Sequence, residues 1–131
     1  MVEAVEQTGV LHTIVVYLRD AAATSPRQTT FMSGIAVALL SNLMNNLPAG
    51  LLAATVGQSA ALPLHVTGGL LIGVDLGPNL SITGSLATIL WLIALRREGL
   101  SITAWPFLKL GIVVMPPALI AALLVLAFSP F

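Results

Sequence analysis

Two short polar segments interrupt an otherwise strongly apolar chain, and they limit its possible folds more than any other feature. The first, residues 41–48, lies between apolar stretches at 31–40 and 51–56 and holds three asparagines. An unpaired polar group in hydrocarbon costs roughly 2–7 kcal/mol, so these side chains must face protein, water or a ligand. Pro48 lacks an N–H and clashes with the carbonyl four residues earlier, which predicts two short helices meeting at a polar tip.

The second interruption, residues 75–81, repeats the pattern with a proline between polar side chains. Pro78 predicts a break in a helix, and Gly73 and Gly77 allow the backbone to deviate there. Irregular backbone at membrane depth is tolerated only where it is buried in protein or lines a cavity, and paired breaks are typical of transporter binding sites. The two segments together predict a membrane transport site.

The composition indicates an all-α integral membrane protein. The 131 residues are 57% hydrophobic and 8% charged, with a mean hydropathy of +1.02, whereas soluble domains carry roughly 25% charged residues. The formal net charge is zero, which gives no electrostatic basis for binding nucleic acid. Cysteine is absent and only His12 and His65 supply imidazoles, so we expect no disulfide, metal site or cofactor. The sequence contains neither a nucleophile–base pair nor a phosphate loop, so no motif in it indicates an enzyme.

The apolar runs predict helices at about 30–44, 47–58, 64–74, 79–97 and 104–128, with non-helical backbone near 45–47 and 75–78. The first two would form a re-entrant hairpin, since about 15 residues at 1.5 Å each are too short to span about 30 Å. The third and fourth would form one broken transmembrane helix. The fifth would be a C-terminal transmembrane helix.

The more polar start of the chain is expected to form a separate unit at residues 1–28, ahead of a transmembrane transport region at 29–131. This unit would comprise a truncated helix end, with Glu3 and Glu6 solvated, and an interfacial amphipathic helix ended by a turn at 24–29. Its opening residues are typical of a start inside a larger protein. Beyond the transport site, Arg96 and Arg97 place their loop in the cytoplasm by the positive-inside rule.

The chemistry of the two breaks suggests a binding site for a small hydroxyl-bearing solute together with a proton or sodium ion. A broken helix would leave carbonyls exposed near 73–75 and N–H groups near 79–81. The asparagines at i, i+3 and i+4 of the first segment would share one helix face. Asn79 would cap the second half of the broken helix, with Ser81 and Ser85 one turn apart. The candidate substrate-binding residues are Ser41, Asn42, Asn45, Asn46, Asn79, Ser81 and Ser85.

Three other polar residues in the apolar region have either a functional or a purely structural role open to them. Asp75 is the only acid between residues 21 and 97, and a charged Asp at the bilayer centre costs ~2.5–3.5 kcal/mol on insertion scales. We therefore expect Asp75 to couple transport to a proton or cation, the alternative being a helix-terminal Asp that pairs only with nearby N–H groups. Thr67 and Thr83 can bond carbonyls four residues earlier in their own helices and need no ligand.

The two motifs also resemble those of a known family. The runs NLMNNLP at 42–48 and GVDLGPNLSITGSLAT at 73–88 are similar to the C-terminal third of bacterial arsenite efflux permeases, the arsenical pump membrane proteins. The resemblance covers about residues 30–128 and includes Trp91 and Trp105. It implies half of an inverted-repeat transporter of the ion-transporter superfamily, with the hairpin tip and the broken helix lining one half of the substrate site.

By this resemblance the chain would serve in arsenite or antimonite efflux, by ion-coupled antiport across the bacterial inner membrane, as a multi-pass fragment of a full-length permease. Its expected partners are arsenite or antimonite, a proton or sodium ion, the lipid bilayer, and either an arsenite-stimulated ATPase or the missing N-terminal part of the permease. Two alternatives remain open: a sodium/proton or anion carrier of the same superfamily, and a non-transporting membrane subunit. An in-frame extension in the upstream genomic sequence would remove the subunit alternative.

Overall fold

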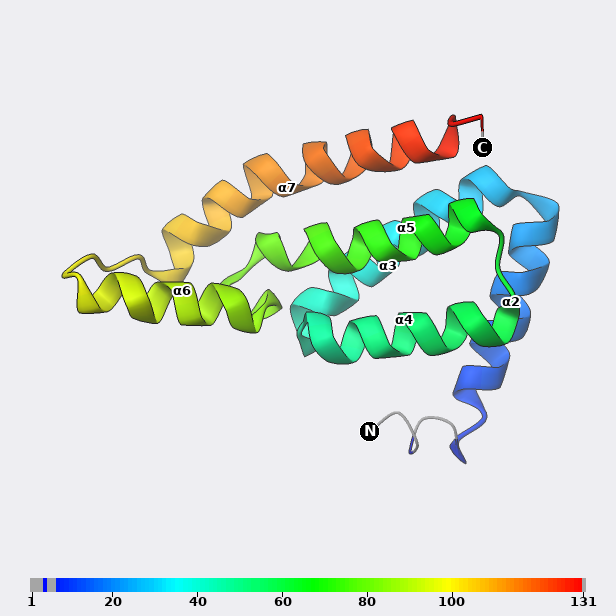
Figure 1. The fold of residues 1–131 in the computed structure, drawn as a ribbon, viewed down its shortest axis with the longest axis horizontal. Helices are drawn as coiled ribbons and strands as arrows, with labels where there is room; N and C mark the ends of the chain where they lie inside the picture. The colour runs from blue at the N-terminus through cyan, green and yellow to red at the C-terminus, as the bar shows by residue number, and fades with distance from the viewer. Residues whose placement is uncertain (1–3, 5–6, 131) are drawn as a thin grey trace.

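The computed structural model describes residue 4 and residues 7–130, whose regular structure is entirely helical, as the composition predicted. Helices α3, α4, α5 and α7 run lengthwise, α2 crosses one end of them, and α6 projects beyond the other end (Figure 1). The α-helices of the described part are α2 (Val10–Thr24), α3 (Pro26–Met44), α4 (Asn46–Ala60), α5 (Leu64–Leu76), α6 (Leu86–Arg97) and α7 (Ala104–Ala127). Two 3-10 turns, η1 (Gly77–Leu80) and η2 (Ile82–Gly84), lie between α5 and α6.

Helices α3 and α4 form a hairpin whose joint is Asn45 alone, with φ 75° and ψ 155°. Asparagine tolerates positive φ better than most residues, and its Oδ1 accepts a hydrogen bond from the Leu47 N–H at 3.4 Å. Pro48 lies in the first turn of α4, where a missing N–H removes no intrahelical bond. The predicted interruption is therefore confirmed, but it occupies one residue and not residues 45–47.

The hairpin is also longer than predicted, because α3 begins at Pro26 and α4 ends at Ala60. The expected turn at residues 24–29 is wrong: Ser25 alone separates α2 from α3. Proline is well suited to the first position of a helix, so Pro26 starts α3 and does not keep it from forming. At 19 residues α3 is about 28 Å long, which weakens the length argument for a re-entrant segment.

The break between α5 and α6 is later and longer than predicted. Helix α5 continues through Asp75 to Leu76, and α6 begins only at Leu86, so the expected helix start near residue 79 is wrong. Ser81 and Ser85 are both extended, at φ −135° and −144°. Pro78 lies inside η1, a tighter turn that tolerates its ring, and the Ser85 hydroxyl caps α6 by accepting from the Ala87 N–H at 3.2 Å.

The most extensive contact in the described residues joins α3 to α5 through small residues at four-residue spacing. A Cβ added to Gly69 would lie 2.7 Å from the Thr30 carbonyl oxygen, and one added to Gly73 would overlap the Gly34 carbonyl oxygen. The two backbones therefore touch with no side chain between them. The facing stripes are Thr30, Gly34 and Ala38 on α3, and Gly69 and Gly73 on α5 followed by Gly77 at the start of η1.

Two apolar clusters join further helices, one linking α7 to α3 and the other linking α2 to α4. On one side α7 packs Met115, Leu119 and Leu123 against Ala38 of α3. On the other side Leu11 and Val15 of α2 pack against Val56 and Ala60 of α4. Helix α2 thus buries part of its apolar stripe against protein, and its predicted place at a membrane interface stays a prediction. Glu3 and Glu6 lie outside the described residues.

Helix α7 is the one helix of the described chain that is long and apolar enough to cross a membrane. Its 24 residues correspond to about 36 Å. The helix continues through Pro116 and Pro117. Its Gly111 faces η1 so closely that an added Cβ would overlap the Leu80 carbonyl oxygen and lie 2.9 Å from that of Asn79. The predicted last helix is confirmed, and it supports the break from one side.

Candidate functional site

The tip of the hairpin meets the break after α5 at the side chain of Asn42, near the end of α3. Asn42 Nδ2 donates to the Ala38 carbonyl at 2.9 Å and to the Gly77 carbonyl at 2.5 Å. Asn42 Oδ1 accepts from the Ser81 hydroxyl at 2.9 Å. The two polar interruptions, which lie far apart in sequence, are therefore joined directly by one amide group.

The orientation of this amide is fixed by its surroundings. Carbonyl oxygens only accept hydrogen bonds, so the Asn42 atom that faces the carbonyls of Ala38 and Gly77 must be the NH₂ nitrogen. Both of its hydrogens are then used within the protein. The side chain of Asn42 thus has no donor left for a ligand in this arrangement, and its role on the described contacts is to hold the break against the tip.

The other predicted residues of the tip differ from one another in exposure. Ser41 is fully buried, and its hydroxyl donates to the Ala38 carbonyl at 2.8 Å. Asn45 is half-buried at the joint, and Asn46 is half-buried as the first residue of α4. The prediction that three asparagines share one helix face is wrong, because the helix ends between Asn42 and Asn46. They are gathered instead around the joint of the hairpin.

At the break, Asn79 has a different role from the one predicted. Its Nδ2 donates to the carbonyls of Asp75 and Leu76, at 3.3 and 3.1 Å, so it caps the end of α5 and not the start of α6. The carbonyls at that end are consequently less available to a cation than the sequence suggested, since Asn42 occupies the Gly77 oxygen as well. Ser81 and Ser85 do not lie one turn apart on a helix, because η2 separates them.

Asp75 lies in the last turn of α5 with its side chain exposed. The stripe of α5 that packs on α3 contains Gly69 and Gly73. Successive helical residues turn by about 100°, which places Asp75 on nearly the opposite side. Within the described part of the chain, the side chain of Asp75 is thus exposed and not buried. Any partner that it has in a larger assembly would come from outside these residues.

Two further residues at the break, Thr83 and Gly84, make contacts that the sequence does not predict. Thr83 is exposed, and its hydroxyl lies 3.3 Å from that of Ser81 and bonds no carbonyl of its own helix, so the backbone-bonding interpretation is wrong. Gly84 is buried where a Cβ would overlap the Pro78 carbonyl oxygen and lie 2.9 Å from Asn42 Oδ1. The available signal for both was the run of small and hydroxyl residues after Pro78, which cannot continue as an ordinary helix.

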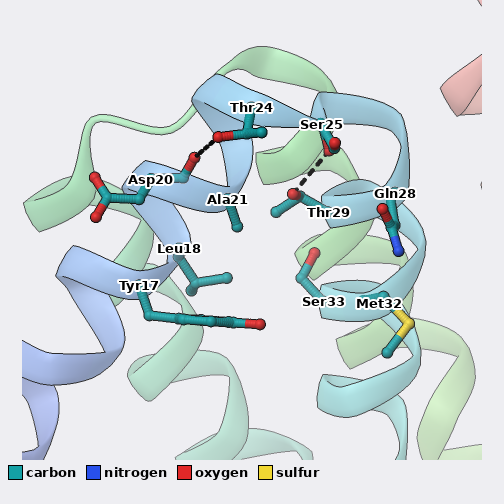
Figure 2. Close-up of a pocket in the computed structure, with 10 residues that line it drawn as sticks. All are labelled: Tyr17, Leu18, Asp20, Ala21, Thr24, Ser25, Gln28, Thr29, Met32 and Ser33. Atoms are coloured by element: carbon teal, nitrogen blue, oxygen red, sulfur yellow. Dashed lines mark hydrogen bonds between the residues drawn. The ribbon is translucent and has the colours of Figure 1, made fainter.

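A hollow lined in part by polar side chains lies between α2 and α3, with a volume of about 470 Å³. Figure 2 shows the Tyr17 ring reaching across this pocket towards Ser33, while the Asp20 carboxylate points away from it. The hydroxyls of Thr24 and Thr29 already donate to the carbonyls of Asp20 and Ser25, each at 2.9 Å. The hydroxyls of these two threonines are thereby used within the protein, and the pocket contains none of the residues of the tip or the break.

No cluster of three His, Cys, Asp or Glu side chains with metal-binding geometry occurs in residue 4 and residues 7–130. The polar groups gathered at the tip and the break are amides, hydroxyls and carbonyls, with Asp75 as the nearby acid. Such groups exchange hydrogen bonds with hydroxylated solutes, because each hydroxyl can both donate and accept. The arrangement is suited to recognition through oxygen, not to redox or thiolate chemistry.

Comparison with known proteins places the chain among membrane pumps. A family model described as arsenical pump membrane protein matches residues 1–128. An arsenical pump membrane protein of Escherichia coli is 38% identical over 102 residues, covering 75% of this chain and 24% of the relative. A relative from Yersinia enterocolitica is 36% identical over 107 residues, with the same shares covered. A putative arsenical pump membrane protein of Bacillus subtilis (strain 168) is 28% identical over 134 residues, covering 98% of this chain and 30% of the relative.

No solved structure is significantly similar to the chain. The chain spans about a quarter of the length of the Escherichia coli and Yersinia relatives. The match to the family model nevertheless runs through α2 to α7 and includes both polar interruptions, which confirms the resemblance seen in the motifs. The family is one of membrane pumps and not of enzymes. Because the model matches nearly the whole sequence, the chain belongs to the arsenical pump membrane protein family.

Proposed function

We propose that this chain forms one half of the substrate site of a permease that exports arsenite or antimonite by ion-coupled antiport. Family membership and the junction of the hairpin tip with the break support this proposal. The observation that carries it is the Asn42 amide, which joins the two interruptions through Gly77 and Ser81. Paired irregular segments that meet inside a helical membrane protein are the usual form of a transporter binding site.

The proposed membrane arrangement follows from the positions of the helices. Helix α7 spans the bilayer, α5 and α6 form a broken span, and α3 with α4 forms a re-entrant hairpin that enters and leaves on one side. The hairpin joint lies beside the break, part-way along the molecule, while the α6–α7 loop lies beyond it, which supports a tip that ends inside the membrane (Figure 1). Arg96 and Arg97 at the end of α6 favour the cytoplasm of a bacterial inner membrane.

Within this arrangement the predicted binding residues divide into two groups. Ser41 and Asn42 have their donors occupied by the backbone and would position the site. Ser81, whose hydroxyl donates to Asn42, belongs with this positioning group. Four groups remain open or half-open and would contact the substrate: Asn45, Asn46, Asn79 and Ser85. A neutral hydroxylated arsenic or antimony species can exchange hydrogen bonds with all of them, and the cysteine-free chain has no thiolate to offer instead.

Coupling is assigned to Asp75, the one acid that lies close to the break. It would exchange a proton or bind sodium from the side of α5 that the described residues leave open. The remainder of the permease would cover that side, and an arsenite-stimulated ATPase is the other proposed partner. Because the chain spans about a quarter of its relatives, all of these activities belong to the complete transporter.

The test is a hybrid permease in which residues 29–131 replace the aligned segment of the Escherichia coli relative. It is expressed in a bacterial strain that lacks its own arsenite pump, and growth in arsenite is compared with arsenite uptake into everted vesicles. We expect resistance and uptake near those of the parent relative. A hybrid that inserts at normal levels yet gives neither activity would contradict the proposal and favour a non-transporting subunit, whereas exchange of sodium or anions alone would favour another carrier.

A further inference from the structure

The hydroxyls at the break form a chain of hydrogen bonds with a defined direction. Ser81 must donate its single hydrogen to Asn42, because the Asn42 oxygen that it contacts at 2.9 Å can only accept. The Ser81 oxygen then has lone pairs but no hydrogen left. Thr83, whose hydroxyl lies 3.3 Å from that oxygen, is consequently the donor of the next bond. From donor to acceptor, the chain of hydrogen bonds therefore runs from Thr83 to Ser81 and from Ser81 to Asn42.

This direction determines what Thr83 presents to its surroundings. With its hydrogen directed at Ser81, the exposed Thr83 oxygen offers only lone pairs to a ligand. The donor-to-acceptor direction of these hydrogen bonds is fixed at Asn42, because the Asn42 amide is held by the carbonyls of Ala38 and Gly77 and cannot turn over without losing both bonds. Buried Gly84, beside Asn42, closes the turn that carries Thr83, with its N–H donating to the Ser81 carbonyl at 3.2 Å.

We propose that Thr83 is a specificity-determining residue that accepts a hydrogen bond from a neutral, hydroxyl-bearing substrate, and that Ser81 and Asn42 are positioning residues that fix its polarity. The inference rests on the proposed transport function and deepens it. An acceptor at this position favours the fully protonated species As(OH)₃ or Sb(OH)₃, since each of their hydroxyls can donate. It disfavours oxyanions, which present acceptors of their own and need donors opposite them.

The experiment uses the hybrid permease and measures KM and maximal rate for arsenite uptake into everted vesicles. Thr83→Val keeps the shape of the side chain and removes the hydroxyl, and Thr83→Ser keeps the hydroxyl. Thr55→Val is the matched control, because the Thr55 hydroxyl donates to the Leu51 carbonyl of its own helix at 2.9 Å. We expect Thr83→Val to raise KM about tenfold at normal membrane levels, as loss of a net hydrogen bond does. Thr83→Ser and Thr55→Val should keep the parent KM.

Positioning is tested separately by Ser81→Ala, which frees the Thr83 hydrogen to turn outward. We expect this variant to raise KM for arsenite and to let arsenate, an oxyanion, compete for uptake where it does not compete in the parent hybrid. An unchanged KM in Thr83→Val would overturn the inference while leaving the transport proposal intact. A parent hybrid without any uptake would instead overturn the transport proposal itself, so the two failures are distinguished by the same set of vesicles.

Discussion

The side-chain amide of Asn42 donates a hydrogen bond to the backbone carbonyl of Gly77, 35 positions further along the chain. This bond joins the last turn of α3 to the first residue of the irregular segment after α5. It gives a side-chain partner to a carbonyl that lies just beyond the C-terminal end of α5. The hairpin and the broken helix are thereby held in one arrangement by an interaction that neither segment makes alone.

Asn42→Ala should therefore damage both stability and transport. The substitution leaves the Gly77 carbonyl and the Ser81 hydroxyl without their partner, which costs about 1–3 kcal/mol of unfolding free energy for a buried group. Thermal unfolding of the purified hybrid in detergent and arsenite resistance in cells measure the two effects. Leu43→Ala, at a neighbouring side chain that is 86% exposed, is the control and should change neither.

Asn46→Ala provides a contrasting case at the first residue of α4. Its side chain is half-buried next to the joint residue Asn45 in sequence and is one of the proposed substrate contacts. We expect resistance to arsenite to be lost while membrane levels and the unfolding temperature stay near those of the parent. Full resistance in Asn46→Ala would show that this asparagine only packs at the joint.

Gly73→Ala should destabilise the contact between α3 and α5. The new methyl group would overlap the Gly34 carbonyl, which belongs to the backbone and has no rotamer into which it can move. We expect a loss of about 1–3 kcal/mol, typical of overpacking. Gly57→Ala is the matched control, since a Cβ there would meet only Leu70 Cδ1 at an ordinary 3.8 Å. Equal unfolding temperatures for the two variants would contradict the close backbone contact.

Asp75→Asn tests coupling, because it keeps the size and hydrogen bonding of the side chain and removes its charge. We expect the variant to bind arsenite and to exchange it down a substrate gradient, but to lose uptake driven by a pH gradient in everted vesicles. Asp20→Asn, an equivalent change at an exposed acid of α2, should leave pH-driven uptake unchanged. Equal pH-driven rates in Asp75→Asn and the parent would place coupling in another part of the permease.

The re-entrant topology can be tested with single cysteines, because the chain contains no natural one. Gln28→Cys and Ser59→Cys, at the two outer ends of the hairpin, should react with a membrane-impermeant maleimide from the same side of the membrane. Ser101→Cys in the α6–α7 loop should react from the other side. All three side chains are exposed. Leu47→Cys, at the tip, should react far more slowly than Ser101→Cys, and equal labelling from that side would indicate a hairpin that crosses the membrane.

The positions of the two interruptions can be predicted from the sequence, because proline and clustered amides conflict with a continuous apolar helix. The residues at which the helices begin and end are harder to predict, because they depend on local chemistry. The sequence predicts that Pro26 lies in a turn, whereas it begins α3, and that Asn79 caps α6, whereas it bonds the carbonyls at the end of α5. In each case the residue type is compatible with both outcomes, so residue type alone does not decide between them.

The contacts of the candidate site were beyond the reach of the sequence for a different reason. The bond between Asn42 and Gly77 depends on how α3 aligns with α5. That alignment follows from a stripe of glycines that packs on small residues of α3, and the sequence does not show that the two stripes match. Gly73 and Gly77 are assigned by the sequence to the flexibility of the break, although Gly73 lies within α5.

The contact between α3 and α5 also limits how this sequence can drift over evolutionary time. Enlargement of a residue in an ordinary core can be compensated when the side chain opposite becomes smaller. At Gly69 and Gly73 the atoms opposite are the carbonyl oxygens of Thr30 and Gly34, which no substitution can shrink. These two positions therefore have no second-site partner that could rescue a larger residue, and descendants of this chain must keep glycine there or separate the two helices altogether.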